Sequence, residues 1–223
     1  MIFSRLDRGH ESHKERNFYT KVFAGCLFNE LLSSYEHTST GFLDLLHTRY
    51  GQLSEEIPGA VVSDVASEIL RKLAYSKPPM SLTFDYHAYQ LDKNADNGEL
   101  GDIVIFTPDS SVCIEAKLYD DWCFHEDFAA NRRRIETVSE LTSLHGIQVM
   151  LLSKRKWENC KAQQNHSGSH YKRLQTALQE LTGSVPFMLL FWEDLYGLVR
   201  TEPNLAAAAS YMDSMLKSNG WKR

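Results

Sequence analysis

The chain contains no apolar run that approaches the roughly 20 residues needed for a membrane-spanning helix. Its N-terminal segment, residues 1–16 with the sequence MIFSRLDRGHESHKER, is too polar for a secretory signal peptide. These two absences predict a cytoplasmic protein with no membrane partner.

Cysteines are few and scattered. The four of them, Cys26, Cys113, Cys123 and Cys160, include no C-x-x-C pair. That arrangement favours reduced thiols over disulfide bonds or a zinc site.

Positive charge is not in excess either, because 24 Lys and Arg residues are outnumbered by 29 Asp and Glu residues, for a net charge of −5. This balance argues against a strongly basic nucleic-acid-binding domain. It does not exclude a nuclease, in which an acidic metal site adds negative charge and bound cations help to neutralise the substrate phosphate.

Length and composition fit one globular domain. The chain has 223 residues, of which 43% are hydrophobic and 24% charged, values typical of a soluble protein with one full core. It contains no internal repeat and no heptad run. We therefore predict a single domain over residues 1–223.

The most informative stretch is residues 101–118, GDIVIFTPDSSVCIEAKL. Its two apolar runs, Ile103–Phe106 and Val112–Ile114, flank the turn-rich residues 107–111. Apolar runs bounded by Gly, Pro and Ser predict two paired strands of a hairpin.

Three charged side chains lie in or beside these strands, namely Asp102, Glu115 and Lys117. A charge inside an apolar strand is costly unless it is paired or binds a cation. Because side chains alternate along a strand, Glu115 and Lys117 share one face while Ala116 points to the other. Asp102 begins the partner strand and can reach the same place. The three charges predict a site for a hard divalent cation beside a lysine.

This pattern resembles that of the PD-(D/E)XK nuclease superfamily, which has an acidic residue on one strand and (D/E)-x-K on the next. Here the residues are Asp102 and Glu115-Ala116-Lys117, and Gly101 stands where the family has proline. The resemblance implies that Asp102, Glu115 and the backbone carbonyl of Ala116 hold Mg²⁺ or Mn²⁺. It also implies that Lys117 orients or activates the attacking water and steadies the developing negative charge.

A wide apolar stripe at helical spacing predicts a first helix over residues 11–34. Glu15 lies on the apolar side of this helix. Members of the superfamily often carry a glutamate on the first helix that faces the metal site, so the resemblance implies that Glu15 is a further catalytic residue. The alternative is an ordinary first-turn acid that is stabilised by the helix dipole.

The remaining patterns predict an α/β fold. Helices are expected over residues 39–50, 60–75, 127–144, 171–181 and 203–217, and further strands over 80–91, 147–152 and 187–191. In the second of these helices, Val61, Val65, Ile69 and Leu73 are expected to lie on one face. Residues 161–169 are expected to be flexible.

The order of these elements resembles the restriction-endonuclease-like αβββαβ core, a mixed central sheet flanked by helices. Residues 39–79 would then be a helical insertion and residues 200–223 a C-terminal helix. The strand–helix–strand order around residues 127–144 predicts a crossover between two parallel strands.

Short basic runs supply candidate contacts to nucleic-acid phosphates, although such runs are more often solvated faces. The candidates are Arg132, Arg134, Lys154, Arg155 and Lys156. In the superfamily, the helix after the E-x-K strand often lends a Gln, Asn or Arg to the site, which suggests Asn131 and Arg134 here.

Two functions follow from this resemblance. The first is a Mg²⁺-dependent nuclease that hydrolyses phosphodiester bonds, with DNA as the expected substrate. The second is a non-catalytic PD-(D/E)XK-fold binding or scaffold protein in a DNA-processing or defence complex; the presence of Asp102, Glu115 and Lys117 favours the first. The sequence shows no helix-turn-helix, zinc finger or RNA-binding signature. Targeting is therefore expected to come from a partner protein or from DNA structure. The alternative to a partner protein is a homodimer, since many members of the superfamily act as dimers.

Overall fold

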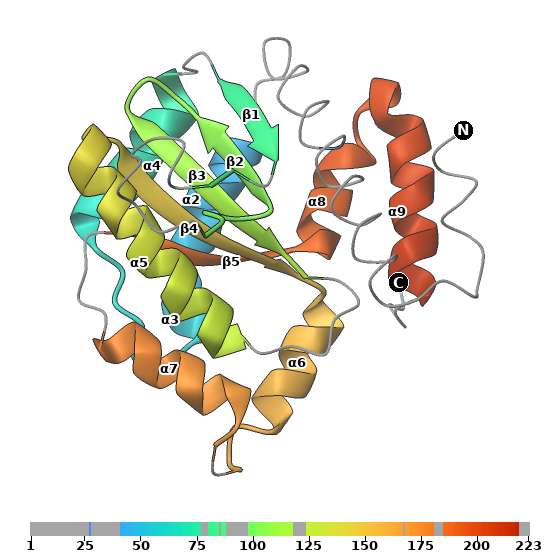
Figure 1. Cartoon of the computed structure of the whole chain (residues 1–223). Coiled ribbons are helices and arrows are strands. Elements are labelled where there is room, and N and C mark those ends of the chain that lie inside the picture. The colour runs from blue at the N-terminus through green and yellow to red at the C-terminus, as the bar shows by residue number, and fades with distance from the viewer. Residues whose placement is uncertain are drawn as a thin grey trace.

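The computed structural model describes residues 27, 41–76, 80–84, 86–87, 98–117, 124–166, 168–180 and 185–218. Within these ranges three helices are followed by three successive strands, and two further strands then lie between helices along the chain (Figure 1). Their bounds are α2 Phe42–Gly51, α3 Leu53–Glu56, α4 Asp64–Ser76, β1 Ser81–Phe84, β2 Ile103–Phe106, β3 Ser110–Ala116, α5 Phe124–Thr142, β4 His145–Leu152, α6 Lys154–Ala162, α7 His170–Glu180, β5 Phe187–Phe191, α8 Trp192–Val199, the 3₁₀ helix η3 Pro203–Leu205, and α9 Ala206–Ser218.

The strands form one mixed sheet in the order β1-β2-β3-β4-β5. The pairs β1–β2 and β2–β3 are antiparallel, whereas β3–β4 and β4–β5 are parallel. The predicted crossover is confirmed, because α5 connects the parallel neighbours β3 and β4. Strand β5, with the sequence FMLLF, is buried along its whole length, as expected for a parallel strand covered on both faces.

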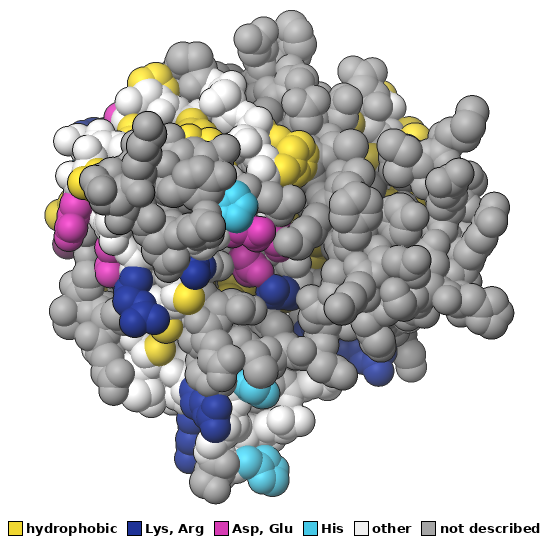
Figure 2. All heavy atoms as spheres, in the orientation of Figure 1, with side chains coloured by type: hydrophobic (Ala, Val, Ile, Leu, Met, Phe, Trp, Pro, Cys, Tyr) yellow, Lys and Arg dark blue, Asp and Glu magenta, His cyan; other side chains and the backbone are white. Residues whose placement is uncertain are grey.

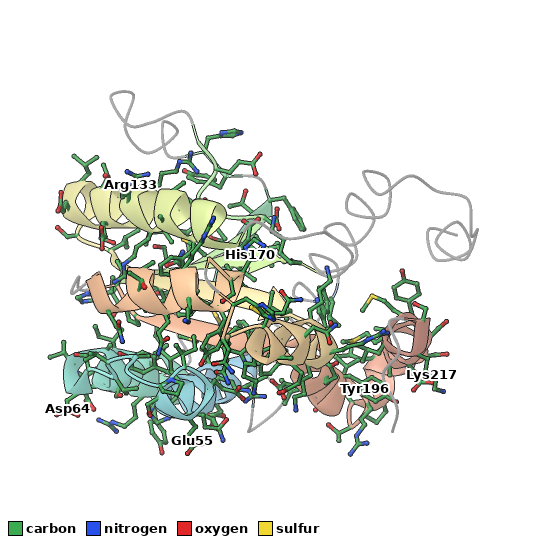
Figure 3. The ribbon with its side chains drawn as sticks, turned by 90° about the horizontal axis from the view of Figure 1, so that it is seen from below. Glu55, Asp64, Arg133, His170, Tyr196 and Lys217 are labelled. Carbon is green, nitrogen blue, oxygen red and sulfur yellow. The ribbon has the colours of Figure 1, made fainter. Side chains whose placement is uncertain are left out.

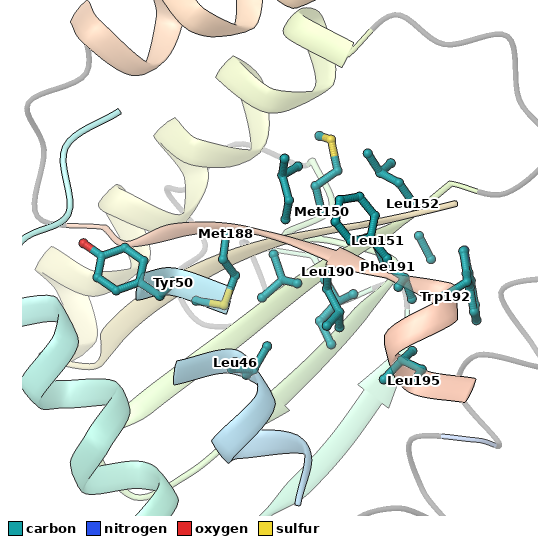
Figure 4. Packing of buried hydrophobic residues seen from close by; sticks show 14 of the residues in the cluster. Leu46, Tyr50, Met150, Leu151, Leu152, Met188, Leu190, Phe191, Trp192 and Leu195 are labelled. Carbon is teal, nitrogen blue, oxygen red and sulfur yellow. The ribbon is translucent and has the colours of Figure 1, made fainter. Parts of the chain in front are cut away.

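Helices cover both faces of the sheet (Figures 1 and 3). Alternation along the strands sends Ile103 and Ile114 into one core cluster with Leu46 of α2, and sends Val104 and Cys113 into a second cluster with residues of α5. Figure 4 shows the first cluster, in which side chains of α2, β4, β5 and α8 pack together. The motif strands are thus held between two apolar layers.

The C-terminal helix lies beside α8 at one end of the molecule (Figure 1). It was predicted over residues 203–217, and the structure confirms a helical end that begins with η3 and continues as α9. Met212, Met215 and Leu216 of α9 are buried, so this helix packs on the body as expected.

The helix predicted over residues 60–75 begins later, at Asp64, and only the second half of its predicted apolar face, Ile69 and Leu73, packs on the core. Val61 and Val65 are 78% and 72% exposed, while Ala66 and Leu70 are buried. Val61 precedes the helix, so the four-residue spacing counted from it does not define the helical face.

Two further differences concern residues 161–169 and residues 80–91. The first part of the range 161–169, expected to be flexible, belongs to the end of α6. That helix forms because the Ser153 side chain accepts the Lys156 N–H at its start, and because Trp157 and Cys160 bury one face. The strand predicted over residues 80–91 is described as strand only over β1.

The helix predicted over residues 11–34 falls outside the described residues except for Leu27, which is helical and buried. Glu15 is among the residues that the structure does not describe.

Candidate active site

Asp102 precedes β2 and Glu115 lies near the end of β3, at the same end of the β2–β3 pair. The last paired residues are Ile103 and Ile114, so Asp102 directly precedes the paired part of β2 and Glu115 directly follows the paired part of β3. The backbone N–H of Ala116 donates to Asp102 Oδ2 at 2.8 Å, which fixes this buried carboxylate against β3.

A bulge precedes Asp102. Two pairings frame this bulge, Phe84 with Ile103 and His87 with Glu99. Between them the first segment advances by three residues, whereas the second segment spans four. The extra residue lies just before β2, and bulges of this kind re-aim a neighbouring side chain.

Gly101 makes this geometry feasible. A Cβ at this position would lie 2.9 Å from the backbone oxygen of Ile114 and 3.1 Å from its nitrogen. A neighbouring backbone cannot move aside as a flexible side chain can, so the position suits glycine alone. Because Gly101 lies so close to β3, the next residue, Asp102, is also held beside β3, directly before β2.

The backbone carbonyl of Ala116 faces the side of β3 that is turned away from β4. Lys117 N–H donates to Leu151 O of β4 at 2.8 Å, whereas Ala116 N–H points the other way, to Asp102. In a strand the N–H and C=O of one residue face the same neighbour. Ala116 therefore directs its carbonyl oxygen to the side on which Asp102 lies.

Glu115 and Lys117 form a close ion pair, as their shared face predicts. Glu115 Oε1 lies 2.6 Å from Lys117 Nζ, and each side chain is 15% exposed. The second carboxylate oxygen, Oε2, accepts a hydrogen bond of 3.1 Å from Asn131 Nδ2 on α5. The structure thus pairs Glu115 with Lys117 and adds Asn131 as a direct neighbour of Glu115, while Asp102 contacts the backbone of Ala116 between them.

Arg134 orients Asn131. Its Nη1 donates to Asn131 Oδ1 at 3.1 Å and to the carbonyl oxygen of Glu99 at 3.2 Å. Because arginine can only donate, the amide oxygen of Asn131 faces Arg134 and the amide nitrogen faces Glu115.

Figure 2 shows acidic side chains beside basic and histidine side chains near the centre of this face of the molecule.

Arg132, predicted to contact nucleic acid, does not fit that role. Its side chain is 3% exposed and its Nε lies 3.2 Å from Glu136 Oε1. A buried guanidinium cannot meet a phosphate on the protein surface, so Arg132 is excluded from the candidate interface. Its neighbour Arg133 is exposed and lies on the outer side of α5 (Figure 3).

The second basic run lies at the same edge of the sheet as Lys117. Lys154 and Arg155 are exposed and Lys156 is half-buried at the start of α6, which directly follows β4. Since β3 and β4 are parallel, the C-terminal ends of both strands meet at one edge.

Glu193 holds this run in place and was not predicted from the sequence. Its carboxylate oxygens accept the Lys154 N–H at 3.0 and 3.1 Å. Burial raises the pKa of the Glu193 carboxyl, and the hydrogen bond from Lys154 acts in the opposite direction.

Cys113 lies on the face of β3 that carries Glu115, two residues earlier. Burial raises the pKa of its thiol to about 12. The thiolate is therefore not available as a nucleophile at neutral pH.

The oxygen donors suit a hard cation. Asp102 and Glu115 supply two carboxylates. A larger group, of three or more His, Cys, Asp or Glu side chains arranged to hold a metal ion, is not found among the described residues. The third predicted acid, Glu15, lies outside the described residues.

None of the helices within the described ranges is long and apolar enough to cross a membrane. Comparisons with protein-family models, with curated proteins and with solved structures found no match. The function of this site is therefore inferred from its geometry and its chemistry.

Proposed function

We propose that this chain is a Mg²⁺- or Mn²⁺-dependent nuclease that hydrolyses phosphodiester bonds in nucleic acid, with DNA as the substrate. One observation carries the proposal: Asp102 accepts a hydrogen bond from the backbone of Ala116, and the side chains on either side of Ala116, Glu115 and Lys117, form an ion pair. Two carboxylates and an ammonium group are the residues that metal-assisted phosphodiester hydrolysis requires.

In this proposal Asp102, Glu115 and the Ala116 carbonyl hold the divalent cation. When bound, such a cation polarises a phosphoryl oxygen and lowers the pKa of a coordinated water. Lys117 positions the attacking water and stabilises the negative charge that develops on the phosphate oxygens. Asn131 and Arg134 keep the Glu115 carboxylate in one orientation.

The Glu115–Lys117 pair is compatible with a cation at the same carboxylate. An ionised carboxylate has about four lone-pair sites. The contacts to Lys117 and Asn131 each engage one oxygen of Glu115. A cation can therefore share the group with both protein donors.

The order of elements supports the proposed restriction-endonuclease-like core. Three strands joined as an antiparallel meander are followed by α5 and then by β4 parallel to β3. Gly101 replaces the family's proline, and the closeness of the Ile114 backbone gives a physical reason for that departure.

A second candidate function rests on the same contacts. Lys117 and Asn131 engage both oxygens of Glu115, and Ala116 engages Asp102. A polar cluster satisfied by protein groups would also suit a non-catalytic scaffold of the same fold. In that case the protein would bind nucleic acid or a protein complex without cutting.

A cleavage panel distinguishes the two functions. The full chain is incubated with labelled single-stranded DNA, duplex DNA, flap DNA and RNA, each with Mg²⁺, Mn²⁺ or EDTA. The nuclease proposal expects metal-dependent products that Lys117→Met abolishes and Lys72→Met preserves, since Lys72 is 71% exposed on α4. Binding without cleavage under every metal condition would instead favour the scaffold.

A further inference from the structure

A cavity separate from the candidate active site lies between α2, α4, α5, α7 and the start of β5. Its volume is about 400 Å³, which is within the size range of small-molecule sites. Its walls are largely apolar and include Leu53, Ala66, Leu178 and Phe187. Asp102, Glu115 and Lys117 are not among its lining residues.

Arg132 places a positive charge in this apolar cavity. Its side chain is 3% exposed, and the Glu136 carboxylate with which it pairs is 28% exposed. Burial lowers the pKa of the guanidinium, but arginine remains charged in proteins. A guanidinium presents five N–H donors in a planar fork whose geometry matches that of a carboxylate.

Tyr50 adds a second donor. It is 2% exposed, and its hydroxyl oxygen accepts the Ser63 N–H at 2.9 Å. Within the described part of the chain, no acceptor for the Tyr50 hydroxyl hydrogen is found. Figure 4 shows the hydroxyl directed away from the other labelled core residues.

We propose that this cavity binds a small carboxylate with an apolar body. The carboxylate meets Arg132 and the Tyr50 hydroxyl, and the body packs against the apolar walls. Val61 and Val65, which line the cavity and are 78% and 72% exposed, lie where such a body would cover them. The inference is independent of the nuclease proposal, because no residue is shared.

The test uses 4-phenylbutyrate and its neutral isostere 4-phenylbutanamide in calorimetric titrations of the full chain. The acid is expected to bind at least about ten-fold more tightly than the amide, because only the acid pairs with a buried cation. Equal affinities, or no binding of the acid to the wild-type chain, would overturn the proposal.

Variants then locate the site. Tyr50→Phe is expected to weaken binding of the acid about ten-fold, whereas Tyr75→Phe, at a position 75% exposed on α4, leaves it unchanged. Val65→Trp obstructs the mouth from an exposed position and is expected to weaken binding without affecting folding. If circular dichroism shows that Tyr50→Phe is unfolded, Val65→Trp decides, and unchanged affinity in that variant contradicts the assignment.

Discussion

Asp102 accepts a hydrogen bond of 2.8 Å from the backbone N–H of Ala116 and so spans the end of the β2–β3 pair. This bond ties the acid of one strand to the residue that follows Glu115 on the next. The Asp102 carboxylate is therefore fixed against the β3 backbone beside Glu115, and a cation bound by both carboxylates would also tie the two strands together.

Binding of Mg²⁺ or Mn²⁺ is expected to raise the melting temperature of the wild-type chain. The rise is about 3–5 °C when the cation is at roughly ten times its dissociation constant. Asp102→Ala and Glu115→Ala should each abolish the rise, and Asp64→Ala, at the start of α4, should retain it. Calorimetry with and without EDTA measures the effect; a rise retained in Glu115→Ala would place the cation elsewhere.

Gly101→Ala is expected to destabilise the fold. The added Cβ would lie 2.9 Å from Ile114 O, and relieving that contact forces two backbones apart. We expect a loss of about 1–3 kcal/mol in the free energy of unfolding, the usual cost of overpacking. Gly51→Ala is the matched control, because a Cβ in α2 meets nothing within 4 Å. Urea denaturation that shows equal stability for both variants would refute the close approach.

Asn131→Asp tests whether α5 contributes to the cation site. The new carboxylate would face Glu115, whose Oε2 lies 3.1 Å from the Asn131 nitrogen. Like charges at that distance repel, so the variant should melt below the wild type in EDTA and gain more from Mg²⁺ than the wild type does. Asn159→Asp, on the exposed side of α6, should show neither change. Identical Mg²⁺ dependence in wild type and Asn131→Asp would separate α5 from the site.

Glu193 predicts a pH dependence of stability. Because burial raises its pKa in the folded state, the folded protein holds this proton more tightly than the unfolded chain. Its contribution to stability is therefore greatest at low pH and declines as pH rises from the ordinary value of 4.5 through the raised value. Glu193→Gln should remove that decline. Urea titrations across the window measure the difference, which should fall with pH in wild type minus variant; a difference that grows with pH has the wrong sign.

The strand ends could be predicted from the sequence because the period of a strand is fixed. Once Val112–Ile114 is a strand, Glu115 and Lys117 must share a face, and the structure places them 2.6 Å apart. The burial of Arg132 was missed, although a signal existed. Arg132 lies four residues after Phe128 and three before Ile135, both buried on α5, so helical spacing puts it on the apolar stripe.

Other contacts carry no local signal. Glu193 and Lys154 are separated by 39 residues, and only the parallel placement of β4 and β5 brings their strand ends together. The bulge before Asp102 likewise depends on how β1 pairs with the following chain. Such features arise from tertiary packing, which periodicity within one segment does not encode.

The most direct test of the proposed nuclease compares Mg²⁺-dependent cleavage rates of one DNA substrate by wild type, Glu115→Gln and Glu140→Gln. Glu115→Gln keeps the size of the side chain but removes the charge that would hold the cation, whereas Glu140 is exposed near the end of α5. We predict a loss of about 100-fold or more for Glu115→Gln and an unchanged rate for Glu140→Gln. Equal rates for Glu115→Gln and wild type would contradict the proposed site.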